Sequence, residues 1–311
     1  MEKSSERPGY LDLCETGEIV SRISALKECY SHCRLCPHEC GVDRTAGQRG
    51  ICRSGILPVV ASYNVHQGEE PPISGTAGSG TIFLGGCTGR CIFCQNYPIS
   101  QLGAGVETSE DRLAGMMLEL QGRGCHNINF VTPTHFSPSI VAAIAIAAAR
   151  GLRTPIVYNT SGYERVEILR LLEGIIDVYL PDAKYADDEA AAALSGFSGY
   201  VEHNRAALRE MHAQTGILAT RDDLAVKGLI IRHLILPGGL AGTGEVLRFI
   251  AEELSPEVFV SLMDQYFPAY QALKHEVLSR RVSSGEYEEA LEAFDDCGLT
   301  NGWVQDHSEQ E

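Results

Sequence analysis

Three cysteines lie close together in the segment "GGCTGRCIFCQN", which runs from Gly85 to Asn96. They are Cys87, Cys91 and Cys94, so three residues separate the first two and two residues separate the last two. Three thiolates from one loop can bind three irons of a [4Fe–4S] cube, which leaves the fourth iron without a protein ligand. An open coordination position is typical of a catalytic metal centre, whereas structural centres are closed. The spacing therefore predicts a reactive iron–sulfur site with room for a small chelating molecule.

A zinc site is the alternative interpretation of the same cysteines. Zinc would need a distant fourth ligand, for which Cys125 and His126 are the candidates. Structural zinc sites usually combine two paired hooks such as Cys-x2-Cys, and this segment has a single hook and a three-residue gap. The spacing favours iron–sulfur over zinc.

A second group of four cysteines precedes the first. It consists of Cys33, Cys36, Cys40 and Cys52. Four thiolates can close a metal site completely. An auxiliary iron–sulfur cluster there would relay electrons or anchor a substrate, whereas zinc would only hold together a segment with little core of its own. The sequence leaves both metals open, and Cys29 can replace one ligand.

The composition supports metal ligation and excludes several classes of partner. The chain has eleven cysteines in 311 residues, and clustered cysteines in a reducing compartment are typical of metal sites. With 25 Lys and Arg against 41 Asp and Glu, the chain repels nucleic acid and anionic membranes. Its longest apolar run, Ile140 to Ala149, is too short to span a bilayer, and the polar N-terminus lacks the apolar core of a signal peptide. We therefore expect a cytoplasmic protein without a membrane or nucleic-acid partner.

Six short apolar runs are predicted to form the strands that position these cysteines. The runs cover residues 81–86, 128–132, 155–159, 175–180, 229–236 and 258–263. Helices are predicted over 109–122, 138–149, 163–173, 186–194, 201–213 and 243–254, with Thr108 or Ser109 capping the first and Thr243 the last. Such alternation indicates a parallel sheet, either doubly wound or an incomplete β/α barrel. In both folds ligands bind at the C-terminal ends of the strands, where the Cys87 segment begins.

The Cys87 segment is similar to the signature of radical S-adenosylmethionine (SAM) enzymes, because Phe93 precedes its last cysteine and a predicted strand precedes the whole segment. Cys94-Gln95-Asn96 also resembles the Cys-His-Asn of pyruvate formate-lyase activating enzymes. The resemblance implies an incomplete (β/α)6 barrel, a [4Fe–4S] cluster on three cysteines, and SAM as the ligand of the fourth iron. It also implies that one electron cleaves SAM to methionine and a 5′-deoxyadenosyl radical, which abstracts a hydrogen atom from the substrate.

Three further segments resemble the activases in the same order along the chain. Asn159-Thr160-Ser161-Gly162 is similar to their Asp-Thr-Asn-Gly, Asp177 to Lys184 keeps the spacing of their Asp-x4-Asp-x-Lys, and Ile231 to Gly238 is similar to their Ile-Arg segment that ends in Pro-Gly. By resemblance, Asp182 and Lys184 are candidate catalytic residues, and Lys184 and Arg232 are expected nearer the ribose or the substrate. The candidates for contacts with SAM are Thr132, Thr134, Asn159, Ser161, Asp182 and Arg232.

The sequence departs from the activases around the expected substrate. Thr132-Pro133-Thr134-His135 stands where they have Gly-Gly-Glu-Pro, Asn159 replaces an aspartate, and Asp264-Gln265-Tyr266 replaces Pro-Tyr-His. Without the carboxylate, a contact with the SAM ammonium would be weaker. A protein glycine is the substrate that the resemblance implies. Radical modification of a small molecule or of a non-glycyl peptide is the alternative, and a non-catalytic electron carrier with two metal sites is a third possibility.

The expected organisation follows from these motifs. Residues 1–74 form a Cys-rich metal-binding segment that ends in a linker or crossover loop at Gly68 to Gly75, residues 75–270 form the core, and residues 271–311 form a helical tail whose acidic residues lie on a solvated face. A radical SAM core implies an electron donor such as flavodoxin or ferredoxin, and the glycine interpretation adds a protein substrate. His233 is expected to be a hydrogen-bonded core residue, while His135 is a weak candidate for the site.

Overall fold

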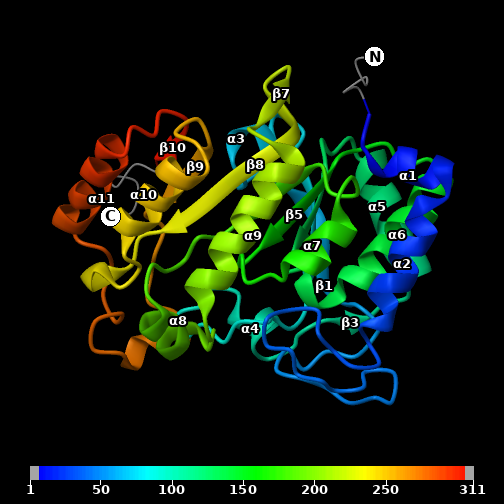
Figure 1. The fold of residues 1–311 in the computed structure, drawn as a ribbon, viewed down its shortest axis with the longest axis horizontal. Helices are drawn as coiled ribbons and strands as arrows, with labels where there is room; N and C mark the ends of the chain where they lie inside the picture. The colour runs from blue at the N-terminus through cyan, green and yellow to red at the C-terminus, as the bar shows by residue number, and fades with distance from the viewer. Residues whose placement is uncertain (1–6, 305–311) are drawn as a thin grey trace.

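The computed structural model describes residues 7–304 as helices and strands around one mixed sheet (Figure 1). The strands are β1 (Val59–His66), β2 (Ser79–Leu84), β3 (Val106–Glu107), β4 (Ile128–Val131), β5 (Ile156–Thr160), β6 (Val178–Pro181), β7 (Ala219–Arg221), β8 (Leu224–Leu234), β9 (Phe259–Met263) and β10 (Gly302–Val304). The helices are α1 (Tyr10–Thr16), α2 (Glu18–Glu28), α3 (Pro71–Ser74), α4 (Tyr97–Ser100), α5 (Glu110–Gly122), α6 (Ser137–Ala149), α7 (Val166–Leu172), α8 (Asp188–Ser195), α9 (Tyr200–Thr215), α10 (Thr243–Glu253) and α11 (Ser284–Asp296). Short 3-10 turns are η1 (Thr134–Phe136), η2 (Pro237–Gly239) and η3 (Ala272–Lys274).

The strands follow the order β10-β9-β8-β6-β5-β4-β2-β1-β3, and the run from β2 to β10 is parallel. All six predicted strands and all six predicted helices are confirmed. The outward face of the strands packs against the long helices in one large core, whereas the inward face meets the short helix α3. This one-sided arrangement is that of the predicted incomplete barrel and not of a doubly wound sheet.

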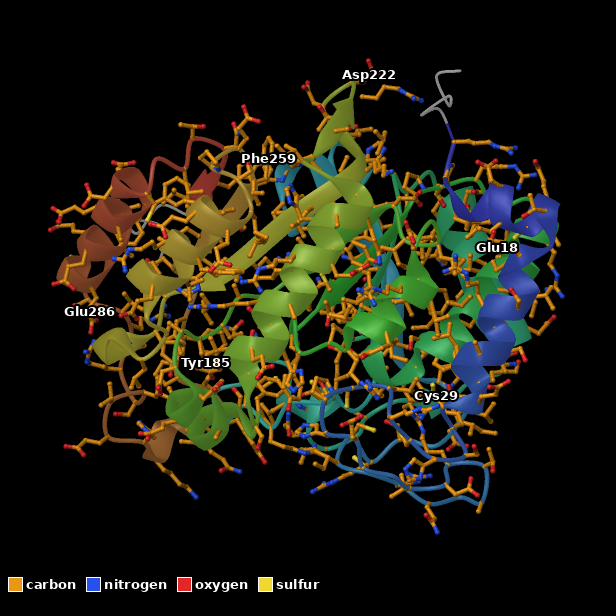
Figure 2. The ribbon with its side chains drawn as sticks, viewed as in Figure 1. Glu18, Cys29, Tyr185, Asp222, Phe259 and Glu286 are labelled. Atoms are coloured by element: carbon orange, nitrogen blue, oxygen red, sulfur yellow. The ribbon has the colours of Figure 1, made fainter. Side chains whose placement is uncertain are left out.

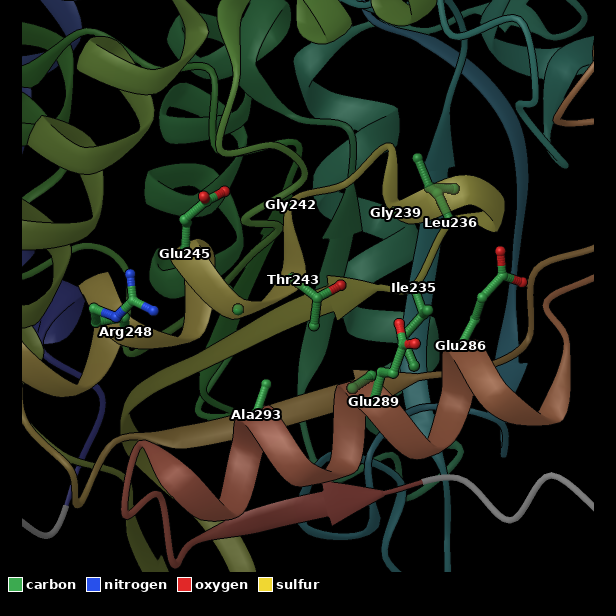
Figure 3. A pocket seen from close by; sticks show the side chains of 12 residues that line it. Ile235, Leu236, Gly239, Gly242, Thr243, Glu245, Arg248, Glu286, Glu289 and Ala293 are labelled. Atoms are coloured by element: carbon green, nitrogen blue, oxygen red, sulfur yellow. The ribbon is translucent and has the colours of Figure 1, made fainter.

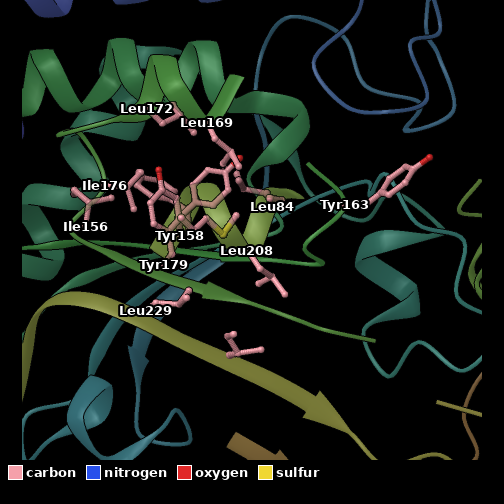
Figure 4. Close-up of a cluster of buried hydrophobic side chains, with 14 of the residues drawn as sticks. Leu84, Ile156, Tyr158, Tyr163, Leu169, Leu172, Ile176, Tyr179, Leu208 and Leu229 are labelled. Carbon is pink, nitrogen blue, oxygen red and sulfur yellow. The ribbon is translucent and has the colours of Figure 1, made fainter. Parts of the chain in front are cut away.

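The two faces of the strands differ in chemistry because successive side chains alternate between them. Outward residues such as Tyr158, Tyr179 and Leu229 are fully buried under the helices (Figure 4). Asn159 and Arg232 each follow an outward residue on their strand, so their side chains point to the inside of the barrel. The inside of the barrel is therefore partly polar, as a ligand-binding interior requires.

Two predictions made from local sequence are wrong. Of the two alternatives for Gly68 to Gly75, the linker is excluded, because Ile73 and Glu70 are buried and α3 packs on β8; the stretch instead connects β1 to β2. Thr243 does not cap α10 with its side chain; its hydroxyl lies 2.9 Å from His233 Nε2 instead. Ser109 does cap α5, since its hydroxyl accepts from the Arg112 amide. Local patterns cannot show which polar groups the tertiary fold brings together.

Four strands escaped prediction, and three of them extend the sheet at its ends. On one side the antiparallel strand β1 pairs with β2 and the edge strand β3 pairs with β1, and on the other side β10 pairs with β9. β1 alternates between buried and exposed positions irregularly, so it gave no clear apolar run. Thus part of the N-terminal segment belongs to the sheet, while the domain boundaries themselves stay a prediction.

The N-terminal segment wraps around one side of the barrel. Helices α1 and α2 pack on α6, and an irregular stretch follows α2 along the lower edge of the view (Figure 1). Arg44 anchors this stretch, because its buried guanidinium donates to the carbonyls of Gly55 and His135 and lies 4.6 Å from the centre of the Tyr30 ring. At the other end of the chain, the acidic block of the tail lies in the helix α11, as predicted, but the tail also contains the strand β10. In residues 7–304, no helix has the length and apolarity that crossing a membrane demands.

Candidate functional site

The loop that carries Cys87, Cys91 and Cys94 begins directly after β2, at the C-terminal end of the sheet. In Figure 2, Tyr185 marks this end of the sheet. Asp222, at the tip of the β7–β8 hairpin, marks the opposite end. The carbonyls of Leu194 and Ser195 accept hydrogen bonds from the loop amides, at 2.9 and 2.7 Å. The end of α8 therefore fixes the middle of the loop.

The three thiols lie within electrostatic range of one another and have polar partners. Ser195 Oγ donates to Cys91 Sγ at 3.0 Å, the Gly89 amide donates to Cys87 Sγ at 3.3 Å, and Cys94 Sγ lies 3.1 Å from Ser100 Oγ. Burial, reinforced by the charge of Cys91, raises the pKa of Cys87 to about 12. Burial also raises the pKa of Cys91. Without a bound cation Cys87 and Cys91 therefore favour the thiol form, and the positive charge of a metal would favour their thiolates.

The donor set fits an iron–sulfur cluster better than a single zinc ion. Within residues 7–304, no group of three or more His, Cys, Asp or Glu side chains has the arrangement of a single-metal site, neither at the Cys87 loop nor among the N-terminal cysteines. Three thiols from one loop are the donor set that binds three irons of a [4Fe–4S] cube. Cys125 and His126 precede β4, whose start pairs with the start of β2, at the opposite end of the strand from Cys87. They cannot supply the fourth ligand of a zinc site there.

Lys184 and Asp182 lie at the C-terminal end of β6 and form an ion pair with 2.6 Å between Nζ and Oδ2. Burial alone would lower the pKa of Lys184, but Asp182 and the nearby Cys91 and Cys94 raise it overall. The ammonium group is therefore charged and close to two of the three cysteines. A fixed cation at this position favours negative charge on the sulfurs and on any ligand that binds between them.

The other SAM candidates fall into two groups on opposite faces of the strands. Asn159 is an inward neighbour of the outward Tyr158, and Asp182 follows the last residue of the adjacent strand. Thr134 instead contacts the outward side, where its hydroxyl donates to Glu164 at 2.5 Å and lies 3.3 Å from Thr160 Oγ1. The structure therefore does not bring Thr134 together with Asn159.

Thr132 and Ser161 contribute through the backbone in this structure. Thr132 has a positive φ of 62°, which is strained for a β-branched residue, and its amide donates to the Asn159 carbonyl at 2.8 Å. The Ser161 carbonyl accepts from the Tyr200 hydroxyl at 3.0 Å. These contacts fix the turns after β4 and β5, and thereby the edge of the barrel mouth.

Arg232 is held inside the barrel by two carboxylates that sequence reasoning missed. Its Nε lies 2.6 Å from Glu70 Oε1, and it also pairs with Glu69, which in turn accepts from Asn129 Nδ2 at 3.0 Å. Burial would raise the pKa of Glu70, but the Arg232 guanidinium lowers it overall. Both glutamates come from the stretch that we expected to be a linker. Two adjacent carboxylates before Pro71 and Pro72 were the only local signal for this ion network.

Glu164 is a further buried carboxyl group that the sequence analysis did not predict. Burial raises its pKa to about 7, although the hydroxyls of Thr134 and Thr160 donate to it. Its second oxygen lacks a hydrogen-bond partner, and Glu164 lies within electrostatic range of the Tyr158 hydroxyl. The same group is within electrostatic range of Cys36. A polar cluster thus lies between β5 and the N-terminal cysteines.

The N-terminal cysteine segment lies directly against the Cys87 loop. His38 Nε2 is 2.8 Å from the Thr88 carbonyl oxygen, and Arg90 donates to the Ile51 carbonyl. A Cβ atom at Gly86 would lie 2.8 Å from the Cys52 carbonyl oxygen, so only glycine fits there. The two groups of cysteines, distant in sequence, are neighbours in the fold.

Cys36 is buried and lies near two of the other N-terminal thiols. Burial raises its pKa well above the ordinary value, and Cys52 and Cys40 add to this effect. Three of the four predicted ligands are thus close enough to interact. The Cys33 amide is bonded to the Val42 carbonyl at 2.9 Å, which closes the loop between them.

Neither His233 nor His135, the two histidines considered in the sequence analysis, is placed as a metal ligand. His233 bonds through Nδ1 to the Ala183 carbonyl at 2.6 Å and through Nε2 to Thr243, which confirms the prediction of a core residue. His135 Nε2 lies 2.9 Å from the Gly85 carbonyl oxygen, and burial lowers the pKa of its ring to about 3. His135 is therefore a neutral support for the start of the Cys87 loop.

A cavity of about 350 Å³ lies between α10 and α11 on the outside of the barrel (Figure 3). Its walls carry Glu245, Arg248, Glu286 and Glu289. None of the predicted site residues lines it. The chemistry predicted from the sequence is therefore at the barrel mouth and not in this cavity.

Comparison with known proteins agrees with the geometry. Residues 81–218 match the Radical SAM superfamily. A relative described as an uncharacterized protein of Methanocaldococcus jannaschii is 30% identical over 305 residues, which are 94% of this chain and 80% of the relative.

Two solved structures are among those that resemble this chain. A radical SAM methyltransferase from Sphaerobacter thermophilus is 14% identical with a TM-score of 0.49, and the match covers 72% of this chain and 66% of that chain. HydG, a maturase of the [FeFe]-hydrogenase, is 12% identical with a TM-score of 0.49 over 74% of this chain and 53% of that chain. The family match over residues 81–218, which contains the cysteine loop after β2, identifies a radical SAM superfamily domain in this chain.

Proposed function

We propose that this protein is a radical SAM enzyme in which Cys87, Cys91 and Cys94 hold the [4Fe–4S] cluster and SAM binds the open iron. When bound, the cluster supplies one electron that cleaves SAM to methionine and a 5′-deoxyadenosyl radical, which takes a hydrogen atom from the substrate. The observation that carries the proposal is the loop of three mutually interacting thiols at the end of β2, with the Lys184 ammonium beside two of them.

The residues around the loop are assigned complementary tasks. Lys184 is assigned to stabilise the negative charge of the thiolates and to orient Asp182, whose carboxylate is assigned as an acceptor for hydroxyl or ammonium groups of SAM. Asn159 offers an amide on the same face. Phe93 is buried and lies 6.0 Å from the ring of Tyr266, so the aromatic pair shields one side of the cysteine loop from water.

We further propose that the substrate is a glycine residue of a partner protein, as in the activating enzymes. The support for this finer assignment is the order of the motifs around Cys94, Asn159, Asp182 and Arg232. A specific observation favours the second candidate, radical modification of a small molecule or of a non-glycyl peptide. The segment after β4 has no carboxylate, and its Thr134 is turned towards Glu164 on the other face.

For the N-terminal cysteines we propose a second metal site on Cys33, Cys36, Cys40 and Cys52. The support is the mutual interaction of Cys36 with Cys40 and Cys52, and their place beside the Cys87 loop. Either an auxiliary iron–sulfur cluster or zinc agrees with four thiolates.

The experiment is anaerobic reconstitution with iron and sulfide, followed by reduction with dithionite in the presence of SAM. We expect 5′-deoxyadenosine from the wild type and none from Cys91→Ala, while Cys125→Ala serves as the matched control because it removes a buried cysteine at the other end of β2. A cluster that forms but yields no deoxyadenosine, and whose spectrum ignores SAM, would instead identify an electron carrier. Mixing the active enzyme with candidate glycyl-radical proteins and recording electron paramagnetic resonance spectra then separates the two substrate classes.

A further inference from the structure

The strand β1 has an unpaired side over most of its length. β2 pairs with one side of β1 as far as His66, whereas β3 covers only Val59 and Val60 on the other side. In residues 7–304, no backbone hydrogen bond outside the β1–β2 pairing reaches residues 62–66. An antiparallel strand bonds to its neighbour with every second residue, so the amides and carbonyls of the alternate residues point to the unpaired side. Residues 62–66, here called the free edge, therefore offer a row of donors and acceptors to another strand.

The free edge lacks the features that usually prevent strands of two molecules from pairing. Protected edges are short, bulged, or carry proline or charged side chains. The bulge of β1 lies between Val60 and Ser62, before the free edge, and residues 62–66 contain no proline, lysine, arginine or carboxylate. At the opposite end of the sheet, β10 is only three residues long. The free edge is thus a regular pairing surface, whereas β10 is protected by its shortness.

A cavity of about 570 Å³ opens beside the free edge, between β1, β3 and the start of α5. The side chains that line it include Val60, Ala61, Tyr63, Val106, Arg112 and Met116. Val106 is 72% exposed, and Val65, which lies on the same face of β1 as Tyr63, is 37% exposed. These exposed apolar side chains would be covered if a further strand were added to β1.

The surroundings of the free edge are electrically neutral. Glu107 and Arg112 are the charged residues that line the cavity, and their charges cancel. The chain as a whole carries a net charge of −16, so two copies repel each other at long range. A neutral region is where two such copies can approach at the lowest electrostatic cost.

The free edge is complementary to itself when two copies run antiparallel. A two-fold axis at Asn64 places Tyr63 of each copy opposite Val65 of the other, and Ser62 opposite His66. Tyr63 is already fixed, because its hydroxyl donates to Glu119 at 2.8 Å and accepts from Arg112 at 2.9 Å. An aromatic side chain opposite a β-branched one is a favourable cross-strand pair, and the Ser62 hydroxyl suits the His66 ring.

We propose that two copies of this chain form a dimer through their free edges, antiparallel about a two-fold axis at Asn64. The two sheets then continue into each other, and β3 of each copy ends the pairing before Val60. Because β1 runs antiparallel to β2, the two barrel mouths point in opposite directions and neither Cys87 loop is covered. The proposal goes beyond the proposed function and does not depend on it.

The test measures the oligomeric state of the full chain after anaerobic reconstitution, by analytical ultracentrifugation over a range of protein concentrations. We expect the wild type to sediment as a dimer that dissociates on dilution. Raising the ionic strength should tighten the dimer severalfold, because salt screens the repulsion between two chains of the same net charge.

Substitutions at Asn64 test the position of the two-fold axis. Asn64→Asp places two like charges opposite each other and should weaken the dimer by roughly fivefold or more, and Asn64→Lys should do the same. A mixture of the two variants brings a carboxylate opposite an ammonium group and should restore the dimer. Asn64 is exposed, so neither variant disturbs the core, and thermal melting checks that both are folded.

Thr220→Asp and Thr220→Lys are the matched controls, because Thr220 is exposed on β7, which pairs only with β8 in the described residues. Both controls should dimerise like the wild type. A monomeric wild type overturns the proposal and leaves the free edge to a different occupant, such as an extended peptide. A dimer that Asn64→Asp leaves intact, or that the mixture of Asn64 variants does not restore, also overturns it, since the copies would then associate through another surface.

Discussion

The two cysteine groups of this protein are positioned by different physical means. The Cys87 loop follows β2 without interruption, and backbone hydrogen bonds to the end of α8 hold it at the mouth of the barrel. The N-terminal group has no regular secondary structure between Cys29 and Pro58, and side-chain contacts from Arg44, His38 and Arg90 attach it to the rest of the fold.

This difference explains why the first group is easier to interpret from sequence than the second. A loop at the end of a parallel strand has its place fixed by the sheet, so its spacing alone indicates an open site. A segment held by separate side-chain contacts has its place fixed by partners far away in sequence. The comparison also predicts that damage to the first group acts on chemistry, whereas damage to the second acts mainly on metal content and stability.

The largest effect is expected at the Cys87 loop. Cys91→Ala should lower deoxyadenosine formation to the background of the assay, because two thiolates from one loop cannot hold the cube securely. Iron analysis should show the loss of this cluster while any metal of the N-terminal group remains. If both metals were lost together, the two groups would be one site and the comparison would break.

Lys184→Met tests the charge beside the loop. We expect deoxyadenosine formation to fall by roughly tenfold to a hundredfold while the cluster is retained, since the variant removes a fixed cation near Cys91 and Cys94. Iron content and the rate are measured on the same preparation. An unchanged rate would show that the Lys184–Asp182 pair is only structural.

Cys36→Ser probes the N-terminal group in the same assay. It should remove the metal of that group, iron or zinc, and leave deoxyadenosine formation reduced only severalfold, because this group lies outside the predicted SAM-binding face. Elemental analysis of this variant identifies the metal. The same analysis of Cys29→Ser shows whether Cys29 belongs to the ligand set. Complete loss of activity with the Cys87 cluster intact would mean that the second metal takes part in the chemistry.

The attachment of the N-terminal segment to the sheet should depend on pH through Asp177. Its carboxylate accepts from the amides of Gly9 at 3.0 Å and Ile156 at 2.8 Å, yet burial raises its pKa to about 7. Because the folded pKa is above the unfolded value, the native state binds more protons. Stability is therefore fully present below about pH 4 and declines as pH rises through about 7, by on the order of 4 kcal/mol from this group.

Urea unfolding of wild type and Asp177→Asn across this range measures the difference. The amide loses one backbone hydrogen bond at every pH, but its stability should lack this decline. Parallel curves for the two proteins would show that Asp177 is ionised in the folded state throughout.

The smallest effect is expected at Arg44, which attaches the middle of the N-terminal segment to the rest of the fold. Arg44→Met removes the donor to the Gly55 and His135 carbonyls and should lower the free energy of unfolding by about 2 kcal/mol. Arg209→Met, which breaks an exposed ion pair with Glu253, should cost less than about 1 kcal/mol. If both variants lost the same free energy of unfolding, contacts other than those of Arg44 would hold the N-terminal segment in place.

The sequence by itself determined the elements and the reactive loop. Apolar runs between turn residues suffice for β2, β4, β5, β6, β8 and β9, because buried parallel strands are apolar along their whole length. The place of Cys87, Cys91 and Cys94 then follows from chain order, and the spacing of the three thiols restricts what they can bind.

Only the tertiary structure decided which polar groups meet. Glu69 and Glu70 pair with Arg232 across more than 160 residues, Thr134 turns to Glu164 rather than to Asn159, and Cys52 lies beside Gly86. These contacts depend on the closure of the barrel and on the wrapping of the N-terminal segment, and neither leaves a periodic pattern in the sequence. Ion pairs and buried hydrogen bonds join whichever groups the packed core brings within about 3 Å, so they are known only once the core is known.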